Sequence, residues 1–298
     1  MQHVDAAMVT KDILNPQAEP RQTLKPLWLF FCVSAACSWI IWLWPLEQQG
    51  PIYPSLFGWR LGVPFALIKL LIGNCVPGIL ALVWTVFEGK QHFRRVLSSL
   101  KNWKSSPRSY LISITLPCII YLIALDIVLL LFPAPHTFPP IKEFFKSLLM
   151  TLPFGPFWEE IAWRAYALRK LEGRYSRFAS ALFLGIYWAV WHIPLWLVTL
   201  NLNQSNRIPV LTGAFVNLVA WAFIFSFLYH RSSDSLPVVI LLHATYVAAS
   251  SQAGAVSPYR GVYLLEISAA LSVLVGVVLS RRLHDKVSNL VPLDRTEG

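Results

Sequence analysis

Runs of apolar residues, each long enough to cross a lipid bilayer, are the dominant feature of this 298-residue sequence. A helix needs about 20 predominantly apolar residues to span the hydrocarbon core of a membrane. The chain is 56% hydrophobic and 13% charged, whereas soluble domains contain roughly a quarter of charged residues. We therefore predict an all-α, polytopic membrane protein with about eight transmembrane helices. The expected spans are residues 27–46, 62–87, 109–132, 147–168, 178–200, 209–229, 236–253 and 262–280.

Positive charges are divided unequally between the segments that connect these spans. A net charge of +10 would suggest nucleic acid as the partner of a soluble protein, but Lys and Arg lie near the span ends here. If the N-terminus is cytoplasmic, the cytoplasmic segments hold 18 Lys and Arg and the external segments hold 5. This bias predicts cytoplasmic tails at 1–26 and 285–298 and one membrane domain at 27–284. We expect a bacterial plasma membrane, membrane lipids as partners and no nucleic acid.

The segment 88–108 mixes basic residues with apolar ones and is the longest predicted connection on the cytoplasmic side. This composition is typical of an amphipathic helix that lies in the membrane surface. A plain basic loop is the alternative.

Six charged residues fall inside the predicted spans, where each costs at least a few kcal/mol and therefore indicates a functional site. Three of them share one short stretch, namely Glu159, Glu160 and Arg164. The other three are isolated, and we expect each of these to make a single polar contact between helices. The isolated residues are Lys69, Asp126 and Glu266.

Helical geometry gives the two adjacent carboxylates different roles. Glu160 and Arg164 are four residues apart and are predicted to form an ion pair. Glu159 points about 100° away, without that partner, and suits a general base. Pro153 and Pro156 are expected to interrupt the span just before, either sharply or as a kink, so that the carboxylates lie in the first turn of a new helical segment.

Two histidines lie in the middle of later spans. From the cytoplasmic ends of their spans, Glu160, His192 and His243 lie at depths of roughly 14, 21 and 10 Å. We therefore expect them to share one zone in the inner half of the membrane. Trp188 precedes His192 by one helical turn and is predicted to line the same cavity.

At these residues the sequence resembles the CPBP family, which contains the type II CAAX prenyl endopeptidases and Abi-type bacteriocin-processing or immunity proteins. The family signature consists of E-E-x-x-x-R, F-x-x-x-H and H-x-x-x-N/D on successive membrane helices. The first motif is intact here. The second has Trp188 in place of Phe before His192, and the third has Val247 in place of Asn or Asp after His243. The resemblance covers about residues 143–253, the expected catalytic core.

The resemblance implies a catalytic set of Glu159, Glu160, Arg164, His192 and His243. Glu159 would be the general base, His192 would help to hold or activate the water, and His243 would stabilise the oxyanion. Val247 cannot donate a hydrogen bond. Either Tyr246, Asn217 or a backbone group therefore takes over in the substrate cavity, or activity is weakened or lost.

The resulting hypothesis is an intramembrane endopeptidase that cleaves a membrane-tethered or lipidated peptide, such as a prenylated CAAX-type peptide, with an activated water. Glu159, His192 and His243 could instead hold zinc, and the family has been described both as metal-dependent and as glutamate proteases. A metal-free site is favoured because no cysteine lies near the cluster and no H-E-x-x-H motif occurs. A non-catalytic immunity or scaffold protein is the alternative. A proton-relaying transporter is disfavoured because the sequence shows no inverted repeat.

Overall fold

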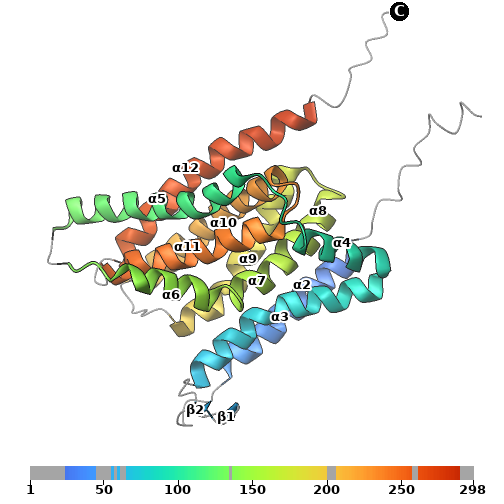
Figure 1. The fold of residues 1–298 in the computed structure, drawn as a ribbon, viewed down its shortest axis with the longest axis horizontal. Helices are drawn as coiled ribbons and strands as arrows, with labels where there is room; N and C mark the ends of the chain where they lie inside the picture. The colour runs from blue at the N-terminus through green and yellow to red at the C-terminus, as the bar shows by residue number, and fades with distance from the viewer. Residues whose placement is uncertain are drawn as a thin grey trace, which may run out of the picture.

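The structure is a computed structural model that describes residues 24–44, 55–56, 59–60, 65–133, 136–199, 206–256 and 261–288. These residues form helices and one short antiparallel pairing of β1 (Ser55–Leu56) with β2 (Trp59–Arg60). The prediction of an all-α polytopic membrane protein is confirmed (Figure 1). The helices are α2 (Lys25–Leu43), α3 (Phe65–Glu88), α4 (Lys90–Leu100), α5 (Pro107–Leu131), α6 (Ile141–Thr151), α7 (Gly155–Glu160), the π-helix η1 (Ile161–Leu168), α8 (Arg169–Glu172), α9 (Arg177–Thr199), α10 (Arg207–Arg231), α11 (Leu236–Val256) and α12 (Gly261–Ser288).

Seven helices in the described part of the chain are long and apolar enough to cross a membrane, namely α2, α3, α5, α9, α10, α11 and α12. They correspond to seven of the eight predicted spans. Helix α12 continues into the predicted 285–298 tail, and residues 1–23 of the N-terminal tail lie outside the described residues.

The predicted span 147–168 is interrupted in the structure, as Pro153 and Pro156 led us to expect. The chain leaves α6 at Thr151 and begins again at Gly155 with Pro156 in the first turn of α7. A proline is accepted there because its missing N–H would have no helical partner in a first turn. From α7 the helix continues through η1 and α8, and the expected interruption takes the form of a break at residues 152–154 between α6 and α7.

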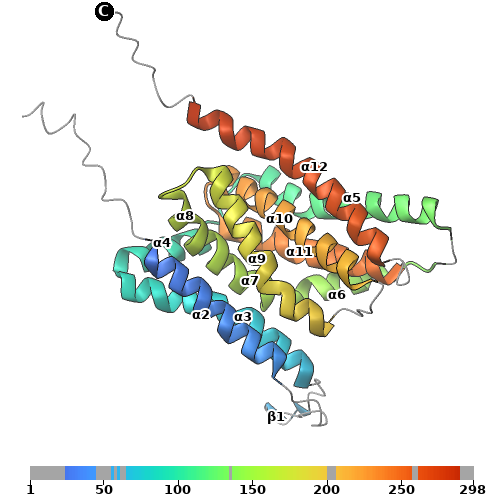
Figure 2. The ribbon, with the colours of Figure 1, turned by 180° about the vertical axis from the view of Figure 1, so that it is seen from behind.

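Helices α10 and α11 form the centre of the bundle. They bury 61% and 67% of their most apolar stretches, whereas α2, α3, α5 and α12 bury 33% or less. In both ribbon views α2 and α3 lie together along one flank, and α5 and α12 lie along the opposite one (Figures 1 and 2). All eight residues of η1 are buried between these layers. The outer helices expose large apolar side chains, as expected for surfaces that face lipid.

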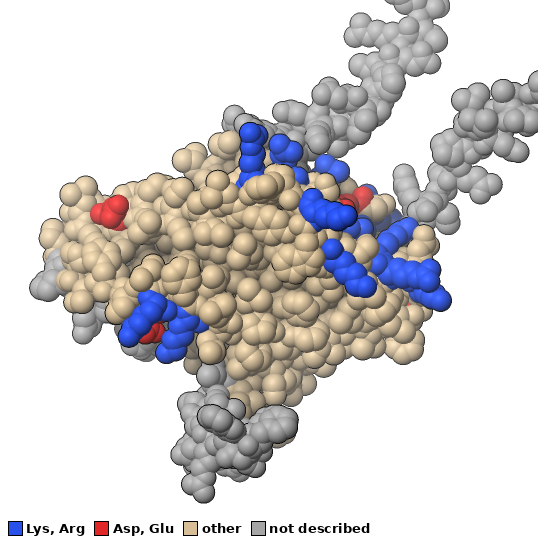
Figure 3. Space-filling model, in the orientation of Figure 1, with Lys and Arg blue, Asp and Glu red and all other residues tan. Residues whose placement is uncertain are grey.

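Basic side chains gather at one end of the molecule, around α4 and α8 (Figure 3). The predicted helix in 88–108 is present as α4, with basic side chains exposed and Val96 and Ser99 buried. Gly89 precedes it with φ 116°, a conformation that residues with a Cβ rarely adopt. The position of α4 at a membrane surface stays a prediction.

The three isolated charges behave differently from one another. Lys69 donates a hydrogen bond of 2.8 Å to the carbonyl of Trp44 at the end of α2, which confirms a contact between helices. Asp126 and Glu266 are exposed instead. Each lies five residues from the end of its helix, close enough for a carboxylate to reach the membrane interface.

Candidate active site

A fully buried ion pair joins the end of α7 to η1. Arg164 Nε lies 3.2 Å from Glu160 Oε2, and Arg164 Nη1 donates a hydrogen bond of 3.4 Å to Glu160 Oε1. His243 on α11 contacts the same Oε1 atom through Nδ1 at 2.9 Å. The ion pair predicted from the four-residue spacing is therefore present. Glu160 is shared between a guanidinium and an imidazole from two different elements.

Two aromatic rings enclose the Arg164 guanidinium. Its Cζ atom lies 4.9 Å from the ring centroid of Trp188 on α9 and 4.5 Å from that of Phe225 on α10. A cation over a ring face is stabilised more strongly when it is desolvated. Arg164 thus links η1 to α9 and α10, and its buried charge is balanced by Glu160 and by the two ring faces.

Glu159 is also buried, but its neighbours are different. Its Oε2 atom accepts hydrogen bonds from the indole nitrogens of Trp188 at 2.8 Å and Trp163 at 3.3 Å. No ion pair joins Glu159 to any residue in the part of the chain that the structure describes. Its other oxygen lies beside Gly155, where an added Cβ would be 3.2 Å from Oε1 and 3.7 Å from Asn74 Nδ2. A side chain at position 155 would therefore crowd this oxygen, and the glycine avoids that contact.

His192 lies next to the same tryptophan. Its Nδ1 is 2.8 Å from the Trp188 carbonyl. A carbonyl only accepts, so Nδ1 carries the proton and Nε2 is the acceptor in the neutral ring. The rings of His192 and His243 lie 5.6 and 5.5 Å from that of Trp188. The structure thus brings all five predicted catalytic residues and Trp188 together, while their roles stay predictions.

Tyr246 and Asn217 belong to a separate network. Asn217 Nδ2 donates to the hydroxyls of Tyr246 and Tyr121, both at 3.3 Å. The Tyr246 ring lies 6.3 Å from that of His243, so the pair adjoins the site. No hydrogen bond between described residues connects it to Glu159 or Glu160.

Sequence reasoning missed several residues of the site. Trp163 follows Glu159 by four positions, so the spacing that indicated the ion pair could also have indicated this contact. Asn74 is an uncharged polar residue in an apolar span, and a search restricted to charged residues passes over it. Phe225 and Tyr121 carry no sequence signal that separates them from packing aromatics.

The donor set does not fit a zinc site as arranged. A catalytic zinc takes three protein ligands and leaves one position open. The described residues contain no group of three His, Cys, Asp or Glu placed to hold a metal. Glu160 is engaged by Arg164 and by Nδ1 of His243, whereas no hydrogen bond between described residues occupies Nε2 of His192 or Nε2 of His243.

Comparison with known proteins identifies the same part of the chain. Residues 141–249 match the family described as type II CAAX prenyl endopeptidase Rce1-like. The protein named CAAX prenyl protease 2 from Methanococcus maripaludis is 27% identical over 106 residues, which are 33% of this chain and 38% of that relative. The alignment therefore spans well under half of the length of the relative. Every predicted catalytic residue lies within the matched segment.

Proposed function

We propose that this chain, whose segment 141–249 belongs to the type II CAAX prenyl endopeptidase family, is an intramembrane endopeptidase. Its substrate would be a membrane-tethered or lipidated peptide whose scissile peptide bond reaches the buried carboxylates. The observation that carries this proposal is that two neighbouring glutamates have different partners. Glu160 is bound in an ion pair, while Glu159 is buried without one, held by two indole N–H groups and adjacent to His192.

In the proposed reaction, Glu159 takes a proton from a water as its oxygen attacks the peptide carbonyl carbon. His192 Nε2 accepts the second hydrogen of that water and so orients it. His243 directs Nδ1 at Glu160, and in its imidazolium form Nε2–H can donate to the oxyanion that develops on the carbonyl oxygen. Glu159 then gives its proton to the amide nitrogen as the C–N bond breaks. Arg164 holds Glu160 in place throughout.

A metal-free, glutamate-type mechanism is the form that the contacts support. The described residues contain no group of three ligands placed to hold a metal, and the proposed reaction requires no electrophile other than His243. Metal analysis of the purified active protein would test this form separately from the cleavage itself.

An apolar pocket supports a lipidated substrate. It has a volume of about 300 Å³ and lies between α5, α6 and α11. Tyr121, which bonds to Asn217 beside the candidate site, is one of its walls. A hydrocarbon chain could occupy this pocket while the attached peptide extends toward His243. Prenylated CAAX-type peptides are the substrates that the name of the relative suggests.

Cleavage of a prenylated peptide by the purified protein tests the proposal. Replacing Glu159 with Gln preserves the size of the side chain but removes the base, so the rate should fall at least about 100-fold, the lower range of general-base effects. The matched control is Glu266→Gln, the same chemical change on the exposed face of α12, which should cleave as wild type. Product masses give the rates and the bond cut. Wild-type cleavage by Glu159→Gln would show that the base is assigned wrongly.

A non-catalytic immunity or scaffold function is the second candidate. The specific observation in its favour is Val247, which replaces the family's polar residue, while Tyr246 and Asn217 are bonded within their own network. This function predicts that the wild-type protein cleaves no substrate. It also predicts that, in cells lacking the protein, Glu159→Gln restores the phenotype as well as wild type does.

A further inference from the structure

A small pocket at the basic end of the molecule is lined by four basic side chains. His92 and Arg95 come from α4, and Arg169 and Lys170 come from α8. The pocket has a volume of about 100 Å³. It is separate from the candidate active site, since none of the predicted catalytic residues lines it. Its other walls are Thr85, Val96, Ala165, Tyr166 and Gly173.

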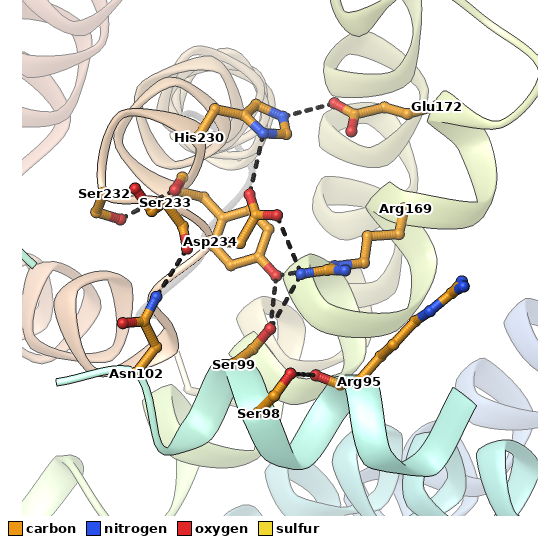
Figure 4. A network of polar contacts seen from close by, with 11 residues as sticks. Arg95, Ser98, Ser99, Asn102, Arg169, Glu172, His230, Ser232, Ser233 and Asp234 are labelled. Carbon is orange, nitrogen blue, oxygen red and sulfur yellow. Dashed lines mark hydrogen bonds and ion pairs between the residues drawn. The ribbon is translucent and has the colours of Figure 1, made fainter. Parts of the chain in front are cut away.

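Two of the four basic side chains are held in fixed positions. Arg169 Nη2 lies 3.1 Å from Asp234 Oδ2 and donates to Ser99 at 3.1 Å, as Figure 4 shows. Lys170 Nζ lies 2.9 Å from Glu88 Oε2, and both of these side chains are largely buried. These contacts neutralise one charge each. They also order the two cations before any ligand arrives.

Arg95 differs from both because its charge is not neutralised. No ion pair or hydrogen bond joins its guanidinium to a residue that the structure describes; the one bond drawn to Arg95 runs from Ser98 to the backbone oxygen. Figure 4 shows the side chain extending from α4 alongside α8, with the guanidinium beyond the network of dashed lines. The pocket therefore has at least one positive charge in excess, with His92 beside it.

We propose that this pocket binds the phosphate diester of an anionic phospholipid headgroup. A guanidinium offers paired N–H donors that match phosphate oxygens. Basic pockets between helices on the cytoplasmic side of a membrane are suited to anionic headgroups. Helix α4 connects the ends of two membrane-spanning helices, α3 and α5. With α4 in its predicted position at the membrane surface, we expect the pocket to lie at the level of the headgroups.

A bound headgroup would tie α4 to the helix that carries the candidate catalytic residues. Ala165 and Tyr166 of η1 line the pocket and directly follow Arg164. Lipid binding is therefore expected to stabilise this part of the bundle. The inference does not depend on the proposed protease activity, and its test measures no cleavage.

The test is lipid-dependent thermal stability of the full chain in an uncharged maltoside detergent. Short-chain phosphatidylglycerol should raise the melting temperature to a plateau, and phosphatidylcholine of the same chain length and inorganic phosphate at equal concentration should not. Arg95→Gln should bind phosphatidylglycerol about tenfold more weakly, the loss expected for a hydrogen-bonded charge. Because Arg95 is exposed, the melting temperature of this variant without lipid should equal that of wild type.

Arg94→Gln is the matched control. Arg94 is the exposed neighbour of Arg95 on α4 and does not line the pocket, so this variant should bind phosphatidylglycerol as wild type does. Equal weakening in both variants would overturn the proposal in favour of diffuse attraction to a basic surface. An Arg95-dependent shift with inorganic phosphate as large as that with phosphatidylglycerol would overturn the lipid assignment. Absence of any shift with phosphatidylglycerol would overturn the site itself.

Discussion

Glu159 and Glu160 have different chemical environments because consecutive helical residues point about 100° apart. Glu160 faces Arg164 and His243, and its charge is balanced within the protein. Glu159 faces α9, where Trp188 donates its indole N–H at 2.8 Å. An indole stabilises a carboxylate by hydrogen bonding without adding a full charge. Glu159 can therefore act as a proton acceptor, whereas Glu160, which is engaged by Arg164 and His243, cannot.

This contact gives Trp188 a positioning role that the family's phenylalanine could not provide. Trp188→Phe would keep an aromatic ring near Arg164 and between the two histidines but would remove the N–H donor. We expect kcat to fall about tenfold, because Glu159 loses the donor that fixes its orientation, and a misplaced catalytic group lowers the rate. KM should change little. Steady-state kinetics on a prenylated peptide measures both constants.

Trp191→Phe provides the control for this prediction. Trp191 is fully buried on the same helix, and its indole nitrogen has no hydrogen-bond partner among the described residues. The substitution therefore removes the same group without removing a bond to Glu159. Equal losses of kcat in the two variants would show that packing, rather than the hydrogen bond, accounts for the effect.

At the scale of elements, the sequence predicts helices well and their local irregularities poorly. Pro153 and Pro156 identified the interruption before α7 because proline has a fixed local effect on a helix. The π-helix η1 was not predicted, because all of its eight residues are buried and a segment without an exposed face has no periodic pattern to read. The four-residue spacing still holds at its start, where Trp163 and Arg164 contact Glu159 and Glu160, but nothing in the sequence indicated the wider helical turn itself.

The turn between α10 and α11 offers a prediction about acid stability. Asp234, at φ 60°, contacts Arg169 and His230 (Figure 4). Partial burial raises the pKa of Asp234, but the hydrogen bond from His230 and the charge of Arg169 outweigh it and hold the pKa below its usual 3.8. A lowered folded-state pKa means that this contribution to stability is present above pH 3.8 and is lost as the pH falls through the folded value.

Asp234→Asn should therefore lower the free energy of unfolding by about 1 kcal/mol or less at neutral pH, because Asp234 is partly exposed and solvent screens it. The difference from wild type should vanish in acid. Asn tolerates positive φ, so the turn itself is preserved and the charge alone is removed. Melting temperatures measured from neutral to acidic pH test this. A difference that persists unchanged in acid would indicate a backbone effect instead.

At the scale of the whole molecule, the sequence located the spans but not their neighbours. Predicted and observed ends agree within a few residues for most of the seven long helices, because each run is bounded by charges or prolines. Which helices pack together was not predicted, since lipid-facing and buried surfaces are equally apolar in a membrane protein. The burial of α10 and α11 at the centre and the pairing of α2 with α3 follow from side-chain shapes that no hydropathy pattern contains.

The number of membrane crossings yields the last prediction. Seven crossings would place the two termini on opposite sides, whereas the 18 to 5 charge bias places both in the cytoplasm. The segment α6 to α8 resolves this if it forms an eighth, broken crossing: residues 155–172 alone extend about 27 Å at 1.5 Å per residue, close to the thickness of the hydrocarbon core. Figure 1 shows α6 and α8 at opposite ends of this segment.

A reporter fused after Gly298 should therefore be cytoplasmic, and one inserted near Asn203, outside the described residues, should be external. With α9 to α12 as four crossings, a third reporter in the 133–140 connection should also be external and one near Arg174 cytoplasmic. Reporters at 133–140 and Arg174 on the same side would mean that the broken segment returns without crossing.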